Sequence, residues 1–183
     1  MALTDVKIGV VRLYLNAAPG QVGSVDLGNT LDGVELTVGQ SFTDVNVDAY
    51  GDTPIDGVLT GTSALVKTKL AEASFQTLQT AIQSGTGVVD RGSLGKPRMG
   101  IGHTAGLLMK GLSFQIVMRP IRNVAAGVDS EDVVLYNVYS SDDVVVPYKV
   151  KDQQVYPVTF KALVNESYED GRRLGHIGPQ TIS

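Results

Sequence analysis

The sequence contains no cysteine among its 183 residues. This absence excludes disulfides, thiolate nucleophiles and cysteine-ligated metal sites, and it fits synthesis in a reducing compartment. Tryptophan is also absent and aromatic residues make up only 6% of the chain. The aromatic platform that sugar-binding modules commonly use is therefore missing, and a monomeric β-sandwich binding module finds little support.

Positive charge and long apolar runs are scarce as well. The net charge is −4, the opposite of the basic surface with which proteins grip nucleic acid phosphates. No apolar run approaches the ~18 residues of a membrane-spanning helix, and Asp5 precedes any apolar run, so we expect a soluble protein without signal peptide or membrane segment. A chain of this length buries roughly 70% of its unfolded surface. One domain over residues 1–183 is expected.

Most of the sequence has the alternating pattern of β-strands. Asp32 and Gly33 are expected to form the tight turn of a hairpin, because glycine accepts the positive φ that such turns need. Residues 6–15 are expected to form a strand with a bulge near Val10 and Val11. Further strands are expected over residues 23–27, 34–38, 42–50, 58–70, 112–118, 133–139, 144–150 and 154–164.

One helix is predicted over residues 72–84, where Phe75, Leu78 and Ile82 recur at helical spacing. A long glycine-rich loop is expected over residues 85–106. Strands outnumber the helix, so the predicted class is mainly β: a β-sandwich or partly closed barrel with one flanking α-helix.

Residues that often carry catalysis do not form a recognisable motif. The run GSLGK, residues 92–96, lacks the glycine and the Ser or Thr that a phosphate-binding P-loop requires. Ser93 and Lys96 have the spacing of a serine–lysine pair, but no helix is predicted there to fix their geometry. His103 and His176 lie among glycines without acidic or thiol neighbours. We therefore predict no enzyme, no cofactor and no metal site.

Four runs in a fixed order carry a resemblance to a known family. They are DLGNTLDGVEL (26–36), DVNVDAYGDTPID (44–56) leading into LAE, GIGHTAGLL through MRP (100–120), and YPVTFKALVN (156–165) followed by GHIG. With these runs the chain resembles the major tail tube proteins of tailed bacteriophages. The resemblance implies a structural virion protein that assembles into stacked hexameric rings. Each subunit would lend a hairpin to a continuous inner barrel, the channel for genome ejection.

The same resemblance implies the partners. The principal partner would be the chain itself, with sheath, tape-measure, baseplate and terminator proteins as further ones. DNA would pass through the channel without specific binding. The protein would be made in the host cytoplasm and reside in the virion tail. A related tube-capping, baseplate-hub or bacterial secretion-tube component is the alternative.

Within this assembly, Asp44, Asn46 and Asp48 alternate with apolar residues and form the polar face of a predicted strand. They are candidates for lining the lumen, where acidic side chains repel phosphates over a Debye length of about 8 Å. An ordinary solvated outer face explains the alternation equally well.

The predicted loop over residues 85–106 carries three basic residues, Arg91, Lys96 and Arg98. In a stacked assembly these residues are candidates for contact with the next ring, because a loop can exchange conformational freedom for contacts that only the polymer provides. A mobile surface loop is an equally good interpretation of the same composition.

Overall fold

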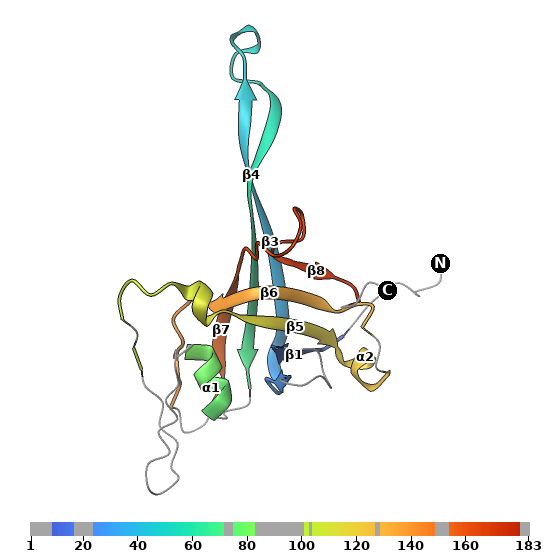
Figure 1. Ribbon diagram of the computed structural model, residues 1–183, viewed down its shortest axis with the longest axis vertical. Coiled ribbons are helices and arrows are strands. Elements are labelled where there is room, and N and C mark those ends of the chain that lie inside the picture. Colours follow the sequence, from blue (N-terminus) through green and yellow to red (C-terminus); the bar gives the residue numbers. More distant parts are fainter. Residues whose placement is uncertain are drawn as a thin grey trace, which may run out of the picture.

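The computed structural model describes residues 9–16, 24–71, 75–82, 101–102, 104–126, 129–148 and 154–179. A body of crossing strands carries one long hairpin that projects from it (Figure 1). The elements are β1 (Val11–Leu15), β2 (Val25–Asp26), β3 (Thr30–Asn46), η2 (Asp48–Tyr50), β4 (Pro54–Leu70), α1 (Phe75–Ile82), η3 (Met109–Leu112), β5 (Phe114–Pro120), α2 (Ile121–Ala126), β6 (Val133–Ser140), β7 (Tyr156–Leu163) and β8 (Gly175–Ile177).

The strands form one antiparallel sheet of eight strands, in the order β2-β1-β5-β6-β7-β4-β3, with β8 beside β6. The prediction of a mainly β fold is thereby confirmed. The described residues do not by themselves form the expected sandwich or partly closed barrel, because their sheet is single and open. Two short helices accompany this sheet, one more than predicted.

Two hydrophobic clusters lie on opposite faces of the sheet. Leu13 and Leu15 of β1 and Ile116 of β5 belong to the main core, whereas Tyr14 and Val117 belong to a smaller cluster. The assignment follows from strand alternation, since successive side chains point to opposite faces. The body therefore has apolar packing on both sides of its central strands.

The helices each complete one of these clusters. The predicted helix over residues 72–84 is confirmed over Phe75–Ile82, and its Leu78 and Ala81 pack into the main core. Helix α2 follows Pro120 and adds Val124 to the smaller cluster. Sequence periodicity missed α2 because its six residues span fewer than two turns.

The predicted hairpin turn at Asp32 and Gly33 is wrong. Both residues do adopt positive φ, 62° and 82°, but they form a bulge inside β3, where the register with β4 shifts between Leu31 and Val34. Chain reversal does not occur there because β2, which precedes the bulge, pairs with β1 and not with β3. The sequence therefore predicts the positive φ at this point correctly, but it does not predict that these residues form a bulge and not a turn.

The expected strands over residues 34–38 and 42–50 are parts of one strand, β3, which ends at Asn46. The expected strand over residues 58–70 is confirmed and begins earlier, at Pro54. These two strands, of 17 residues each, form the projecting hairpin. Its turn contains the η2 helix and Gly51, whose φ is 62°.

Two further strand predictions need correction. The described part of the expected strand over residues 144–150 is irregular. It contains Pro147, which has no backbone N–H to donate to a neighbouring strand. Its Val144 and Val146 pack against the main core instead. Strand β1 begins only at Val11 and pairs with β5 without a register shift, so the bulge expected near Val10 and Val11 is absent. The short strand β8 was not anticipated.

A buried ion pair joins β5 to the start of β6. The Arg119 Nε donates to the Asp132 carboxylate at 2.8 and 3.0 Å, and the two side chains are only 7% and 0% exposed. The hydrogen bond to Asp132 raises the pKa of Arg119, so the guanidinium stays charged. The carbonyl of Asp132 also accepts the Gly178 N–H at 2.8 Å. The ion pair therefore holds β5 against the start of β6, and the backbone hydrogen bond of Asp132 holds the end of β8 at the same place.

Replacing Asp132 with alanine should destabilise the body strongly, because the buried Arg119 guanidinium would lose the carboxylate that accepts its hydrogen bonds. We expect a loss of about 3–5 kcal/mol in the free energy of unfolding, measured by urea titration. The control is Glu166→Ala, which removes an exposed carboxylate 3.8 Å from Lys110 and should cost less than about 1 kcal/mol. Equal losses in both variants would contradict a structural role for the buried pair.

Candidate functional site: a projecting hairpin and the groove at its root

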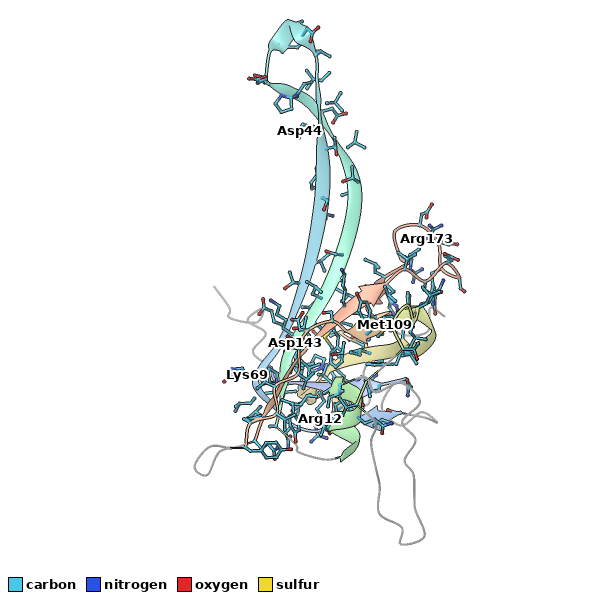
Figure 2. The ribbon with its side chains drawn as sticks, turned by 90° about the vertical axis from the view of Figure 1, so that its left-hand side faces the viewer. Arg12, Asp44, Lys69, Met109, Asp143 and Arg173 are labelled. Carbon is cyan, nitrogen blue, oxygen red and sulfur yellow. The ribbon has the colours of Figure 1, made fainter. Side chains whose placement is uncertain are left out.

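The β3–β4 hairpin is the most prominent surface of the molecule. Strands of 17 residues extend for about 55 Å at the usual rise of a strand, and Figure 2 shows Asp44 far out on the hairpin and Lys69 at its root. Every residue from 40 to 63 is exposed. That run includes large apolar side chains: Phe42, Val45, Val47, Tyr50, Ile55, Val58 and Leu59. The outer half of the hairpin therefore buries no side chain against the described part of its own chain.

The backbone edges of the hairpin are open. In the described part of the chain, β3 pairs only with β4 and so has an unpaired edge along its whole length. Within the described ranges, strand β4 pairs with β7 only over Leu65 to Leu70, and residues 54–64 have no second neighbour there. Such edges present rows of backbone N–H and C=O groups that readily accept another strand.

The two faces of the hairpin differ in their relation to the body. Val34 and Leu36 of β3 pack against the main core, and by alternation Val38 and Phe42 lie on the same face, here called the core-side face. The opposite, open face carries mainly small or polar side chains. On β3 these are Glu35, Thr37, Gly39, Ser41 and Thr43, and on β4 they include Ser63 and Lys67. Three apolar side chains also lie on this face: Val45, Val58 and Leu65.

The predicted lumen residues all lie in the outer half of the hairpin. Asp44 and Asn46 belong to β3, and alternation puts them on its core-side face together with Leu36 and Val38. Asp48 lies beyond the strand, in the η2 helix of the turn. All three are exposed. The structure thus brings them together at one end of the molecule.

Asp32 and Gly33, predicted as a turn, form instead the anchor of the hairpin root. The Asp32 carboxylate accepts a hydrogen bond from Lys69 Nζ at 2.5 Å, and the Gly33 carbonyl accepts one from Thr68 Oγ1 at 3.2 Å. Both partners come from β4. The bulge therefore sets the register from which the two long strands extend.

Gly33→Ala should destabilise the root of the hairpin. A Cβ at this position would meet no atom within 4 Å, so the cost comes from the positive φ of 82° alone. We expect a loss of about 1–2 kcal/mol, measured by chemical denaturation. Gly61→Ala is the control, because it also points into open space but has no positive φ. If Gly33→Ala costs no more stability than Gly61→Ala, then a side chain at residue 33 is compatible with the positive φ of the bulge.

Several predicted residues lie outside the described part of the chain: Arg91, Lys96, Arg98, Ser93 and His103. His176 is described and lies in β8, where its Nδ1 is 2.8 Å from the Tyr136 hydroxyl. Tyr168 stacks on Tyr136 with a centroid distance of 3.7 Å. Burial raises the pKa of Tyr136, so its hydroxyl remains protonated near neutral pH. His176 thus contributes to local packing of the body.

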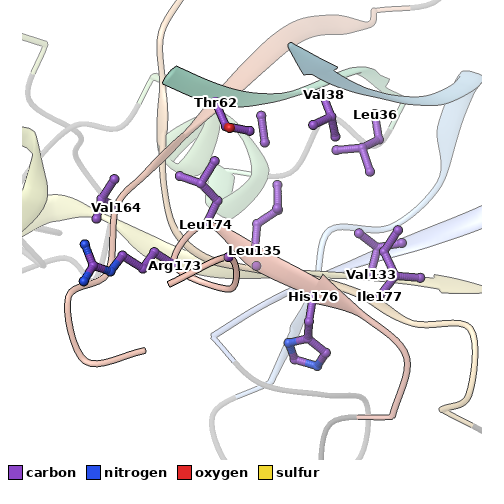
Figure 3. A pocket seen from close by; sticks show the side chains of 13 residues that line it. Leu36, Val38, Thr62, Val133, Leu135, Val164, Arg173, Leu174, His176 and Ile177 are labelled. Carbon is purple, nitrogen blue, oxygen red and sulfur yellow. The ribbon is translucent and has the colours of Figure 1, made fainter. Parts of the chain in front are cut away.

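Sequence reasoning missed a groove of about 360 Å³ at the hairpin root (Figure 3). One wall comes from β3 and β4, and the other from β6, β8 and the segment before β8. No local signal marks it, because its walls come from parts of the chain far apart in sequence. The labelled side chains around it include Leu36, Val38, Thr62, Leu135, Val164, Leu174 and Ile177.

The groove owes its second wall to a close strand contact. At Gly175 the β8 backbone lies so near β6 that an added Cβ would stand 2.2 Å from the Val134 carbonyl oxygen. Only glycine permits this approach.

In the described residues no group of three or more His, Asp or Glu side chains is suited to hold a metal ion. None of the helices that the structure describes has the length and apolarity to cross a membrane.

Comparison with known proteins adds no family to these observations. No protein-family model matches the chain, and no curated protein matches its sequence.

Proposed function

We propose that this chain is a structural protein that polymerises into a tube, as the tail tube protein of a tailed bacteriophage. In this proposal hexameric rings stack around a channel through which the genome leaves the virion. The chain acts through its assembled shape and performs no catalysis. The sequence resemblance to tail tube proteins and the geometry of the hairpin support the proposal independently.

One observation carries the proposal: a hairpin of two 17-residue strands projects from the body with an exposed outer half and unpaired edges. An isolated two-stranded hairpin is marginally stable in water. Each large apolar side chain that becomes buried contributes about 1.5–3 kcal/mol. The exposed residues of the hairpin therefore offer a large gain to any assembly that covers them.

Identical hairpins fit side by side. When neighbouring copies point the same way, β4 of one copy runs antiparallel to β3 of the next, because the two strands of each hairpin are antiparallel. The unpaired segment of β4, residues 54–64, then meets the unpaired edge of β3. Repetition around a ring makes a closed barrel and removes the exposed edges. The barrel expected from the sequence is thus a property of the assembly.

The position of the body favours one face of this barrel for the channel. The body packs on the core-side face through Val34 and Leu36, and six bodies fit around a tube but not within it. The open face, with Thr37, Ser41 and Thr43, then lines the channel. Its small polar side chains lack the dense positive charge that holds phosphates. The earlier assignment of Asp44 and Asn46 to the lumen remains the competing prediction.

Electron microscopy of the purified protein tests the proposal, and long hollow tubes are expected. Phe42→Asp should abolish them, because a charge would replace a large apolar side chain on the core-side face that assembly covers. Phe42 is 59% exposed in the single chain, so the folded subunit should lose no more than about 0.5 kcal/mol in stability. Leu108→Asp is the control: Leu108 is 80% exposed but lies outside the hairpin, and tubes should persist.

Three results would count against this function. A monodisperse monomer of the unaltered protein at high concentration would indicate a binding module. Isolated rings without tubes would favour the capping, hub or secretion-tube alternative. Tubes of normal length from Phe42→Asp would show that the hairpin does not form the wall.

Neighbouring residues on opposite faces decide which side lines the channel. Because the chain has no cysteine, Thr43→Cys and Asp44→Cys each provide one site for a mercury label before assembly. We expect label density inside the channel for Thr43→Cys and within or outside the wall for Asp44→Cys. The reverse arrangement would support the lumen assignment of Asp44, Asn46 and Asp48 and contradict the open-face assignment.

A further inference from the structure

The groove lies where the sheet divides. Strand β6 pairs with β8 through Val133 to Leu135 and with β7 through Asn137 to Ser140, so two branches leave it side by side. The branch through β7 continues into β4 and β3. The groove occupies the angle between β8 and the root of the hairpin (Figure 3).

The lining of the groove is largely apolar and remains accessible. Val38, Val164 and Ile177 are 58%, 47% and 73% exposed. Arg173 lies among the lining residues, with its guanidinium 2.8 Å from Asp170. An occupant must therefore supply apolar side chains, and it needs no charge to neutralise.

A backbone edge also runs into the groove. Strand β4 is paired with β7 up to Leu65, and the next residues toward the tip, Ala64 and Thr62, line the groove. At this point the free segment of β4 begins. A fitting occupant is an extended strand that hydrogen-bonds along this edge and places every second side chain in the groove.

Strand β3 of a second copy meets these requirements. Its edge is unpaired over its whole length in the described chain, and its core-side face presents Val38 and Phe42, which are 58% and 59% exposed. We infer that the groove receives β3 of the neighbouring subunit, whose core-side side chains fill it. This inference rests on the proposed function and names the contact between adjacent subunits.

The size of the two surfaces fits a stable contact. A standard interface involves about 20–30 residues on each side. The receiving side alone reaches this range: the 13 residues that line the groove and the free segment of β4 over residues 54–64, which shares Thr62 and Ala64 with the lining, make 22 residues. Insertion would cover Val38 and Ile177, which are among the more exposed apolar side chains of the body and hairpin root.

This contact joins two different surfaces, a groove on one copy and a strand edge on the next. Such a heterologous contact cannot close into a twofold dimer and instead propagates into a ring or an open helix. The groove therefore gives the assembly its direction around the ring, and each body holds the hairpin of its neighbour.

Two complementary variants test the inference. Ile177→Asp disables the groove, and Phe42→Asp disables the inserted strand; Phe42 does not line the groove. Each variant alone should raise the critical concentration for assembly by at least about 10-fold. An equimolar mixture should form heterodimers, because one intact groove and one intact strand remain. Analytical ultracentrifugation measures the species, and Leu108→Asp is the matched control, which should assemble normally.

The outcomes separate this inference from the proposed function. If the unaltered protein forms tubes and Ile177→Asp forms them equally well, the groove is not the contact and the inference fails alone. A mixture that stays monomeric also overturns it. If the unaltered protein forms no polymer, the proposed function itself fails. Val164→Asp, at another lining residue, should repeat the loss, and unchanged unfolding midpoints establish that both groove variants fold.

Discussion

The need to pair backbone groups governs this structure. Each strand edge exposes amide and carbonyl groups that require partners. In the described residues the main path of the sheet begins and ends with two very different strands, β2 and β3. At one end β2 has two residues, so little edge is exposed. At the other end β3 presents 17 residues. Because one edge is short and the other is long, the two sides of a single subunit offer different surfaces for strand pairing.

The body and the hairpin stabilise themselves in different ways. The body contains packed clusters on both sides of its central strands and a buried ion pair between Arg119 and Asp132. The hairpin depends on its root, where the bulge at Asp32 and Gly33 is held by Lys69 and Thr68. A rigid body thus holds the groove in shape while the outer hairpin keeps its apolar side chains accessible. This division suits a subunit whose final contacts form only with copies of itself.

Local patterns predicted the elements better than their connections. Alternation identified the strands near Val45 and Val58, because period-two patterning depends only on neighbouring residues. The φ of Gly33 was also foreseen, but a left-handed residue serves a turn or a bulge, and long-range pairing decides between them. The groove escaped prediction because its walls combine Val38 with Leu135 and Ile177, which only the folded sheet brings together.

The irregularities of the hairpin make its open edges selective. Register shifts leave one extra residue in β4 at Thr60 and another at Ile55, and the Thr60 hydroxyl donates to the Ser41 carbonyl at 3.1 Å. Bulges interrupt the regular spacing of an edge and increase its twist, so a flat strand from an unrelated protein pairs poorly with it. A second copy carries the same irregularities and the same twist. An edge that disfavours general aggregation can therefore still favour assembly with its own kind.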